Sequence, residues 1–254
     1  MRLLITGASR GIGAALAEMI SARLPDSRML LVARDSEDLC ALGARLEQCS
    51  VFPCDLMAPD GCEDAVSAAA EMFGGLDGVV SNAGTVIPGA LSQTDLSDFD
   101  RAIDLNLRVT FRLAKAAYPF LKSSKGAFVA TGSLAGIHAA PGLGGYSASK
   151  AGMSMLIRQL AVEWGPDGIR CNTVSPGTIL TAMNAATYAD PANRQAREGN
   201  IPMRRLGRPE EVAEVIYFLL QARSSFLSGA DIPVDGAASE SLMSMYLRNG
   251  GAPD

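Results

Sequence analysis

The chain has 254 residues, of which 48% are hydrophobic and 19% charged, and its formal net charge is −5. This length and composition suffice for one domain, residues 1–254, with a large core, and they exclude a disordered chain. Lysine and arginine are scattered along a net acidic sequence, which argues against nucleic acid or an anionic membrane surface as a partner. We therefore expect small molecules as ligands.

Apolar runs of the strand type alternate along the chain with segments whose apolar residues recur at helical spacing. The strands are expected at residues 2–6, 28–33, 50–55, 76–81, 126–132, 169–175 and 230–236. The helices are expected at residues 14–24, 36–49, 60–73, 95–121, 146–164 and from Pro209 onward. Seven strands alternating with helices predict an α/β fold: a single-domain, Rossmann-type, doubly wound parallel sheet with helices on both faces.

Local signals refine this pattern at four places. Ser36 is expected to cap the second helix, and Pro53 places the third strand at an edge of the sheet. The long connection at residues 178–208 is expected to act as a substrate lid. Residues 237–254 form a C-terminal tail, which we expect to pack on a neighbouring subunit or on the domain surface, with fraying as the alternative.

The stretch "TGASRGIG" places Gly7, Gly11 and Gly13 between the first strand and its helix. The first glycine allows a tight turn, the next lets the backbone approach a ligand, and a helix N-terminus favours an anion. Turns and close helix–strand contacts also use glycine, so a structural role is the alternative. With a strand before it and a helix after it, the loop predicts phosphate binding.

The charges after the second strand indicate which dinucleotide would bind. In dinucleotide folds an acidic residue about 20 positions past the glycines binds the ribose 2′-hydroxyl, whereas an arginine accommodates a 2′-phosphate. Here neutral Ala33 is followed by Arg34, and Arg10 lies in the glycine loop. Two guanidinium groups favour NADP(H) over NAD(H). Solvated surface arginines are the alternative, and Asp35 beside Arg34 weakens the case for NADP(H).

The stretch "GGYSASKAG" surrounds Tyr146 and Lys150 with small residues. The pKa of a free tyrosine is near 10, too high for efficient proton exchange at neutral pH. On a helix, residues four apart share one face, so the Lys150 ammonium would favour the phenolate and lower the pKa of Tyr146. A cation–π contact or an inert surface pair is the alternative for an isolated YxxxK pattern. Ser133, thirteen positions before Tyr146, makes a chemical role the stronger interpretation.

The GxxxGxG loop, Ser133, Tyr146, Lys150 and the Asn106 of "DLNLR" together resemble the classical short-chain dehydrogenase/reductase family over residues 2–236. The resemblance implies a catalytic tetrad. Tyr146 would donate a proton to a carbonyl oxygen as hydride arrives from the nicotinamide, and Ser133 would orient that oxygen. Lys150 would lower the tyrosine pKa and bind the nicotinamide ribose, while the Asn106 backbone would position a water that links the lysine to solvent.

The same resemblance implies the cofactor contacts. Asp55 would contact the adenine, the "NAG" turn would let the ribose approach the sheet, and "SPGTILT" would hold the carboxamide. By themselves, the first two would be ordinary turns at strand ends. The chain departs from the family pattern at Ala237, where a second glycine is usual. The full expected set is Gly7, Ser9, Arg10, Gly11, Ile12, Gly13, Arg34, Asp55, Leu56, Asn82, Ala83, Gly84, Tyr146, Lys150, Pro176, Gly177, Ile179 and Thr181.

Targeting and metal signals are weak in this sequence. Glycine and serine interrupt the N-terminal apolar run, and no segment reaches the roughly 20 apolar residues needed to cross a bilayer, so we expect a cytoplasmic protein. Five cysteines without CxxC pairs, together with a single histidine, predict reduced thiols and no metal site. That histidine, His138, would contact substrate or lie in a polar loop.

The sequence thus predicts an NADP(H)-dependent oxidoreductase that interconverts a carbonyl (a ketone, an aldehyde or a 3-oxoacyl group) and an alcohol. The alternatives are a catalytically silent dinucleotide-sensing protein, an NAD-preferring alcohol or polyol dehydrogenase, and a sugar-nucleotide epimerase or dehydratase. The substrate would lie among residues 85–95, 134–145 and 182–206, where Asn184, Tyr188 and a few arginines are candidate contacts. The family resemblance also implies a homotetramer or homodimer formed through the helices that carry Asn106 and Tyr146.

Overall fold

The structure is a computed structural model, and it describes residues 1–34, 37–182 and 184–241. The expected Ser36 cap, the acidic Asp35 and the tail from residue 242 onward lie outside these residues. Of the part that is described, no helix is long and apolar enough to cross a membrane.

The centre of the molecule is a seven-stranded sheet in which every neighbouring pair is parallel. Its spatial order is β3-β2-β1-β4-β5-β6-β7, so the order reverses between β1 and β4. The strands are β1 Arg2–Thr6, β2 Arg28–Ala33, β3 Cys49–Pro53, β4 Gly78–Ser81, β5 Ala127–Thr131, β6 Arg170–Pro176 and β7 Asp231–Val234. The predicted fold class is confirmed, and the third strand lies at the sheet edge, as Pro53 indicated.

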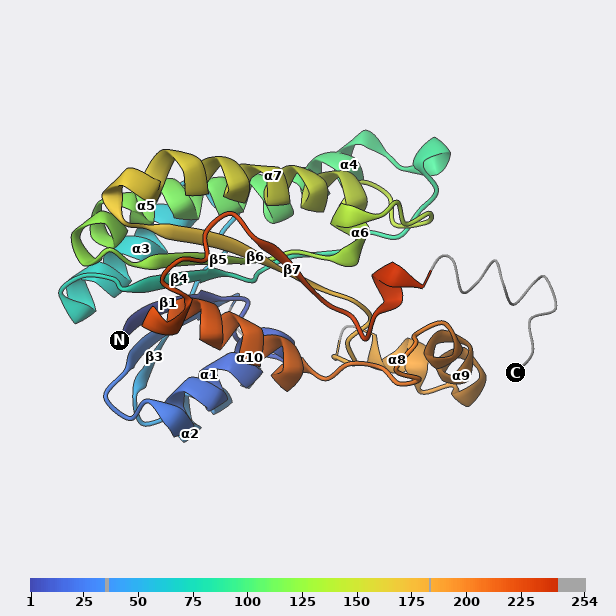
Figure 1. Cartoon of the computed structure of the whole chain (residues 1–254), viewed down its shortest axis with the longest axis horizontal. Helices are drawn as coiled ribbons and strands as arrows, with labels where there is room; N and C mark the ends of the chain where they lie inside the picture. The colour runs from blue at the N-terminus through green and yellow to red at the C-terminus, as the bar shows by residue number, and fades with distance from the viewer. Residues whose placement is uncertain (35–36, 183, 242–254) are drawn as a thin grey trace.

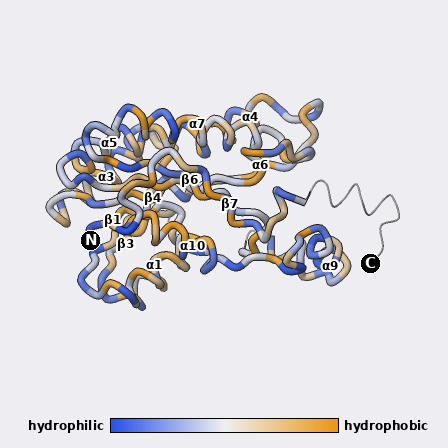
Figure 2. Tube along the Cα trace, in the orientation of Figure 1, coloured by the Kyte–Doolittle hydropathy of each residue, from blue (hydrophilic) through white to orange (hydrophobic). Residues whose placement is uncertain are grey.

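Two layers of helices cover the sheet (Figure 1). One layer contains α1 Gly11–Arg23, α2 Glu37–Arg45 and α10 Pro209–Leu220, and the other contains α3 Gly61–Phe73, α5 Val109–Ser124 and α7 Tyr146–Trp164. Side chains alternate across the sheet, so adjacent residues of β1 enter different cores: Leu3 packs with the α1 and α10 layer, and Leu4 with the α3, α5 and α7 layer. Hydrophobic residues accordingly gather along the strands (Figure 2).

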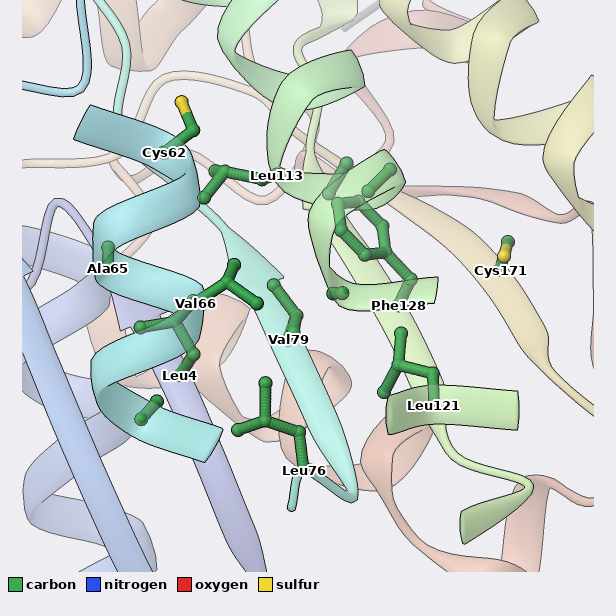
Figure 3. Packing of buried hydrophobic residues seen from close by; sticks show 14 of the residues in the cluster. Leu4, Cys62, Ala65, Val66, Leu76, Val79, Leu113, Leu121, Phe128 and Cys171 are labelled. Carbon is green, nitrogen blue, oxygen red and sulfur yellow. The ribbon is translucent and has the colours of Figure 1, made fainter. Parts of the chain in front are cut away.

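The core on the α7 side is densely packed around the middle of the sheet. Leu4, Val79 and Phe128 project from three strands toward Val66 and Leu113 of the facing helices (Figure 3). All five side chains are at most 1% exposed. This packing fixes α5 and α7 against the strands, and these two helices carry or flank much of the candidate site.

The helical sequence expected over residues 95–121 is divided into three elements. The segment consists of α4 Leu96–Ile103, a π-helical segment η2 Asp104–Arg108, and then α5, which continues to Ser124. A π-helix bonds each N–H one residue further back than an α-helix does, so it adds a residue to the turn and changes the direction of the side chains. Asn106 lies in this π segment and is 1% exposed.

Shorter elements connect the main ones. The segment expected to be the lid contains α8 Ala185–Tyr188 and α9 Pro191–Gly199. Backbone hydrogen bonds close its base, from Leu180 N to Gly207 O at 2.9 Å and from Gly207 N to Thr178 O at 3.0 Å. The remaining helical turns are η1 Leu91–Gln93, α6 Leu134–Ile137, η3 Gly165–Asp167, η4 Ala222–Ser224 and η5 Ala238–Glu240. Movement of the lid stays a prediction.

Candidate active site

The candidate site lies at the carboxyl ends of the central strands. The glycine loop follows β1, the Asn82–Gly84 turn follows β4, Ser133 follows β5, and the segment from Gly177 follows β6. Because all these strands are parallel, their carboxyl ends meet at one edge of the sheet, and the order reverses there between β1 and β4. Such a switch point is where open α/β sheets bind ligands.

The glycine loop is shaped by close backbone approach. Gly7 and Gly11 have φ angles of +63° and +62°, in the left-handed region that favours glycine. A Cβ atom on Gly7 would lie 2.9 Å from Ala83 Cα, and one on Gly13 would lie 2.5 Å from Gly7 O. The loop therefore lies directly against the turn after β4, and a larger residue at either position would displace it.

The N-terminus of α1 leaves room for an anion. Arg10 occupies the N-cap position and makes no side-chain cap hydrogen bond, so it leaves the first-turn N–H groups to other partners. A Cβ on Gly11 would meet only Thr181, whose Cγ2 would lie at 3.5 Å. This geometry fits the phosphates of a dinucleotide, which the Gly7–Gly13 backbone would hold with Thr181 on the far side.

Asn82 ties three strand ends together. Its Nδ2 donates to Thr6 O and to Gly7 O, both at 3.1 Å, and its Oδ1 accepts a 3.0 Å hydrogen bond from Thr131 Oγ1. The side chain of this predicted cofactor residue therefore holds the glycine loop in place. Thr6 and Thr131 were not expected to contribute, because a threonine at a strand end carries no distinctive sequence signal.

The two arginines expected to select the cofactor are both exposed. The side chain of neither Arg10 nor Arg34 forms an ion pair or hydrogen bond with any residue that the structure describes. Asp55 follows β3 by two residues, and its Oδ1 accepts a 3.0 Å hydrogen bond from Met57 N. Leu56 beside it is buried. The arginine side chains are thus free to contact a ligand.

Tyr146 and Lys150 lie on the first turns of α7, which begins at Tyr146. The Lys150 side chain is deeply buried, and its Nζ donates to Thr131 O at 2.7 Å. That nitrogen lies 5.9 Å from the centroid of the Tyr146 ring. Burial lowers the pKa of Lys150 from 10.5 to about 8 because the charged ammonium loses its hydration.

The expected lowering of the Tyr146 pKa by Lys150 is wrong. Burial raises the pKa of the phenol above its usual 10, and the side-chain hydrogen bond with Ser133 opposes part of that rise. The ammonium points to the Thr131 carbonyl instead of the phenol oxygen, so its contact with Tyr146 is with the ring. Tyr146 is therefore a protonated phenol at neutral pH.

Ser133 is brought to Tyr146 by the short helix α6. Its Oγ accepts a 3.1 Å hydrogen bond from Ala135 N and so caps α6. A Cβ on Gly136 would lie 2.9 Å from the carbonyl carbon of Lys150, which shows how closely α6 approaches α7. This close packing brings a serine thirteen positions before Tyr146 near enough to oppose part of the rise in the pKa of its phenol.

Asn106 lies behind this cluster. Its Oδ1 accepts a 2.9 Å hydrogen bond from Thr85 N, and its Nδ2 donates to Thr85 O at 3.0 Å and to Ser149 Oγ at 2.9 Å. A Cβ on Gly84 would lie 2.9 Å from Asn106 Oδ1 and 3.5 Å from Lys150 Nζ. Asn106 and Lys150 thus meet at Gly84, and Lys150 in turn lies beside Tyr146, which lies near Ser133. The structure brings the four residues of the expected tetrad together, with Thr85 and Ser149 as unexpected partners.

The segment after β6 completes the site. Pro176 and Ile179 are buried, and a Cβ on Gly177 would lie 2.7 Å from Asp235 Cβ. Asn184, a candidate substrate contact, instead hydrogen-bonds to the backbone of this turn. Its Oδ1 accepts a hydrogen bond from Thr181 N at 2.9 Å, and its Nδ2 donates one to Ile179 O at 2.8 Å. The turn therefore holds Thr181 near the glycine loop.

Two further candidate substrate contacts lie in different surroundings. Tyr188 lines a cleft of about 450 Å³ between α1 and the α8–α9 segment, and His138 is exposed. In the described part of the chain no cluster of histidine, cysteine, aspartate and glutamate could hold a metal ion.

Comparison with known proteins agrees with this geometry. Residues 7–238 match the family model described as enoyl-(acyl carrier protein) reductase. The chain is 34% identical over 246 residues to a tropinone reductase homologue from Arabidopsis thaliana, covering 94% of this chain and 90% of that protein. It is 32% identical to the glucose 1-dehydrogenase of Gluconobacter oxydans, covering 92% and 90% of the two chains.

Solved structures show the same architecture. The NADP complex of RhlG from Pseudomonas aeruginosa superposes with a TM-score of 0.87 at 31% identity, covering 93% of this chain and 95% of that one. A short-chain type dehydrogenase/reductase from Mycobacterium marinum gives a TM-score of 0.86 at 32% identity, covering 94% and 95%. The chain belongs to the short-chain dehydrogenase/reductase family of oxidoreductases, which act on alcohols and carbonyls with a nicotinamide dinucleotide.

Proposed function

We propose that the protein is an NADP(H)-dependent oxidoreductase that interconverts a ketone, aldehyde or 3-oxoacyl group and the corresponding alcohol. The observation that carries this proposal is the cluster of Ser133, Tyr146 and Lys150 beside the glycine loop, where a phenol, a hydroxyl and an amine converge. Bound NADPH would supply the hydride. The protein supplies the proton and the placement of the reacting groups.

Tyr146 is suited to act as the general acid. Its phenol holds the proton at neutral pH, since burial raises its pKa. The proton can still be donated, because the carbonyl oxygen becomes a more basic alkoxide as hydride arrives. Ser133, whose hydroxyl lies near enough to influence the pKa of that phenol, would hold the same oxygen. Lys150 would bind the nicotinamide ribose, as the family resemblance implies. In the alcohol direction the phenolate takes the proton back.

The preference for NADP(H) rests on Arg10 and Arg34. Both guanidinium groups are exposed and lack described partners, and the neutral Ala33 ends β2 where an acidic residue would bind the ribose hydroxyl. A 2′-phosphate would give them a doubly charged, bidentate partner. The relative solved with NADP supports the same preference. An NAD-preferring alcohol or polyol dehydrogenase is the rival that this argument opposes.

A homo-oligomer is part of the proposal. The outer faces of α5 and α7 expose apolar side chains, among them Phe111 at 46%, Met155 at 59% and Val162 at 79%. These helices lie side by side on one face of the sheet (Figure 1). A second copy packed there would cover that apolar surface without closing the strand ends. Size-exclusion chromatography with light scattering measures the state.

A substrate panel tests the proposed reaction. Ketones, aldehydes and 3-oxoacyl thioesters are offered with NADPH or NADH while the nicotinamide absorbance is followed. We expect turnover of at least one carbonyl class, with a higher kcat/KM for NADPH. Higher efficiency with NADH would refute the arginine argument. Tight binding of NADPH without turnover of any compound would instead support a dinucleotide-sensing protein.

A further inference from the structure

We propose that Ser149 is a positioning residue that locks Asn106 of the π segment to the first turn of the catalytic helix α7. The proposal rests on the proposed function, because it assigns Ser149 a role in that reaction. Ser149 would act through Asn106 and Tyr146, and it would touch neither substrate nor cofactor.

The Ser149 hydroxyl bridges two parts of the site. It accepts a 2.9 Å hydrogen bond from Asn106 Nδ2 and donates a 2.7 Å hydrogen bond to the backbone carbonyl of Tyr146. The residue is 0% exposed, so water cannot replace either partner. One buried hydroxyl thus connects the side chain of Asn106 with the residue that carries the proposed acid.

Asn106 has little freedom while this bridge is intact. Both N–H groups of its amide are used, one toward Thr85 O and one toward Ser149 Oγ, and its Oδ1 accepts from Thr85 N. Its backbone carbonyl accepts a 3.2 Å hydrogen bond from Thr110 Oγ1. Because a π segment lacks the regular α-helical pattern of hydrogen bonds, such side-chain contacts determine its geometry.

Loss of the Ser149 hydroxyl should lower kcat more than it weakens NADPH binding. In Ser149→Ala one Asn106 N–H would be buried without a partner, which is unfavourable unless the amide moves away. Such a movement would disturb the packing of Asn106 against Gly84, and Gly84 lies beside Lys150 Nζ. The glycine loop and its Asn82 brace would be unchanged, so NADPH should bind normally.

The same helix offers a matched control. Ser154 lies on α7 and is 6% exposed, but its Oγ has no hydrogen-bond partner among the described residues. Ser154→Ala therefore removes a buried hydroxyl from the same element without breaking a hydrogen bond. A general sensitivity of α7 to such changes would appear in both alanine variants, whereas a positioning role appears only in Ser149→Ala.

The first test compares the kinetics of folded proteins. Circular dichroism verifies folding, and kcat, KM and the NADPH Kd are then measured well below the unfolding temperature. We expect Ser149→Ala to lose about tenfold in kcat, equivalent to roughly 1.4 kcal/mol, with the NADPH Kd within about twofold of wild type. Ser154→Ala should match wild type, and Ser149→Thr, which keeps the hydroxyl, should recover activity. An unchanged kcat in Ser149→Ala overturns the proposal.

A double-mutant cycle tests whether Ser149 acts through Asn106. In an Asn106→Ala background, Ser149→Ala should change kcat by less than about twofold, because the shared contact is already lost. Effects that multiply independently overturn the proposal, and this result does not depend on whether Ser149→Thr folds.

An NMR measurement separates this proposal from the proposed function. The side-chain amide protons of Asn106 should exchange slowly with solvent in wild type and Ser154→Ala, and faster in Ser149→Ala. Equal exchange in all three proteins overturns the positioning role even if the enzyme is active. Absence of turnover with every carbonyl refutes the proposed function, while the exchange rates still decide whether Ser149 holds Asn106.

Discussion

The two sides of the candidate site are built in different ways. On the catalytic side, Asn106, Ser149 and Lys150 are at most 4% exposed, and each hydrogen-bonds with another part of the fold. On the side expected to hold the 2′-phosphate, Arg10 and Arg34 are exposed and make no polar contact with the described residues.

This difference separates chemistry from cofactor selection. The fold itself fixes the catalytic groups, so changes there should alter turnover and stability together. The arginines gain their partner only from a ligand, so changes there should alter affinity and leave stability unchanged.

The largest effect is expected at the phenol. Tyr146→Phe keeps the partly buried ring but removes the proposed proton donor, so kcat should fall by about 10²–10⁴-fold, the usual contribution of general acid–base catalysis. Steady-state kinetics in both directions measure the loss. Tyr118→Phe, which removes an exterior hydroxyl bonded to Asp167, is the matched control and should retain activity. A Tyr146→Phe enzyme with near-normal turnover would refute the assignment.

The buried Lys150 should lower the free energy of unfolding of the protein at neutral pH. Its folded-state pKa of about 8 lies below the ordinary 10.5, so the unfolded chain binds the proton more tightly. Replacing it in Lys150→Met should therefore raise the free energy of unfolding at pH 7, by up to about 3 kcal/mol, while abolishing activity.

The pH dependence of the free energy of unfolding tests the direction of the Lys150 pKa shift. The unfolded state holds more protons between the two pKa values, so wild-type stability rises relative to Lys150→Met as the pH rises through 8. The gap between the two proteins should shrink by about 1 kcal/mol between pH 7 and 9, measured by urea denaturation. Other titrating groups cancel in this difference. A constant or widening gap would show that Lys150 is not held in a costly environment.

The arginine side should respond only in affinity. The Arg10→Ala/Arg34→Ala double variant should bind NADPH about tenfold more weakly, because two charge-assisted contacts are lost from exposed positions, where solvent weakens them. NADH binding and the thermal unfolding midpoint should not change. Fluorescence titration gives both affinities, and Arg45→Ala, which breaks an exposed ion pair with Glu18, controls for a general loss of positive charge. Equal weakening of both cofactors would contradict the contrast.

The smallest expected effect is a change in the free energy of unfolding at a residue outside both sides of the candidate site. Ala237 has a φ angle of +67°, in the left-handed region that costs a residue with a side chain about 1–2 kcal/mol. Ala237→Gly should therefore raise the free energy of unfolding by up to about 1 kcal/mol without altering kinetics. Ala238→Gly, within the following helical turn, should lower it instead. Stabilisation by both glycines would mean that the backbone strain is not the cause.

Periodicity was sufficient to predict most of the fold. The helix expected from residue 146 to 164 was found as α7 Tyr146–Trp164, because its apolar spacing is an intrinsic property of the sequence. The edge position of β3 followed from Pro53, which lacks a backbone N–H. The π segment could not be predicted, because the partners of Asn106 are Thr85 and Ser149, which are 21 and 43 positions away.

Contacts between residues distant in sequence also limited what could be predicted about the site. A spacing of four residues places Tyr146 and Lys150 on one helical face, and the structure agrees. The sequence does not show where the ammonium points, and Thr131 O, 19 positions earlier, accepts its hydrogen bond. The pKa of Tyr146 likewise depends on burial by segments distant in sequence. Residue types and spacing therefore indicated the members of the cluster, and tertiary packing determined their protonation.

The most direct test of the proposed reaction follows the hydride itself. NADPH deuterated at the transferable position is incubated with a carbonyl substrate found in the panel, and the alcohol is examined by mass spectrometry. We predict one deuterium at the former carbonyl carbon for each cofactor oxidised by the wild type, and a rate of deuterated alcohol formation at least about 100-fold lower with Tyr146→Phe. Cofactor oxidation without deuterium in the alcohol, or equal rates of labelling by the two proteins, would contradict a hydride transfer that depends on the Tyr146 proton.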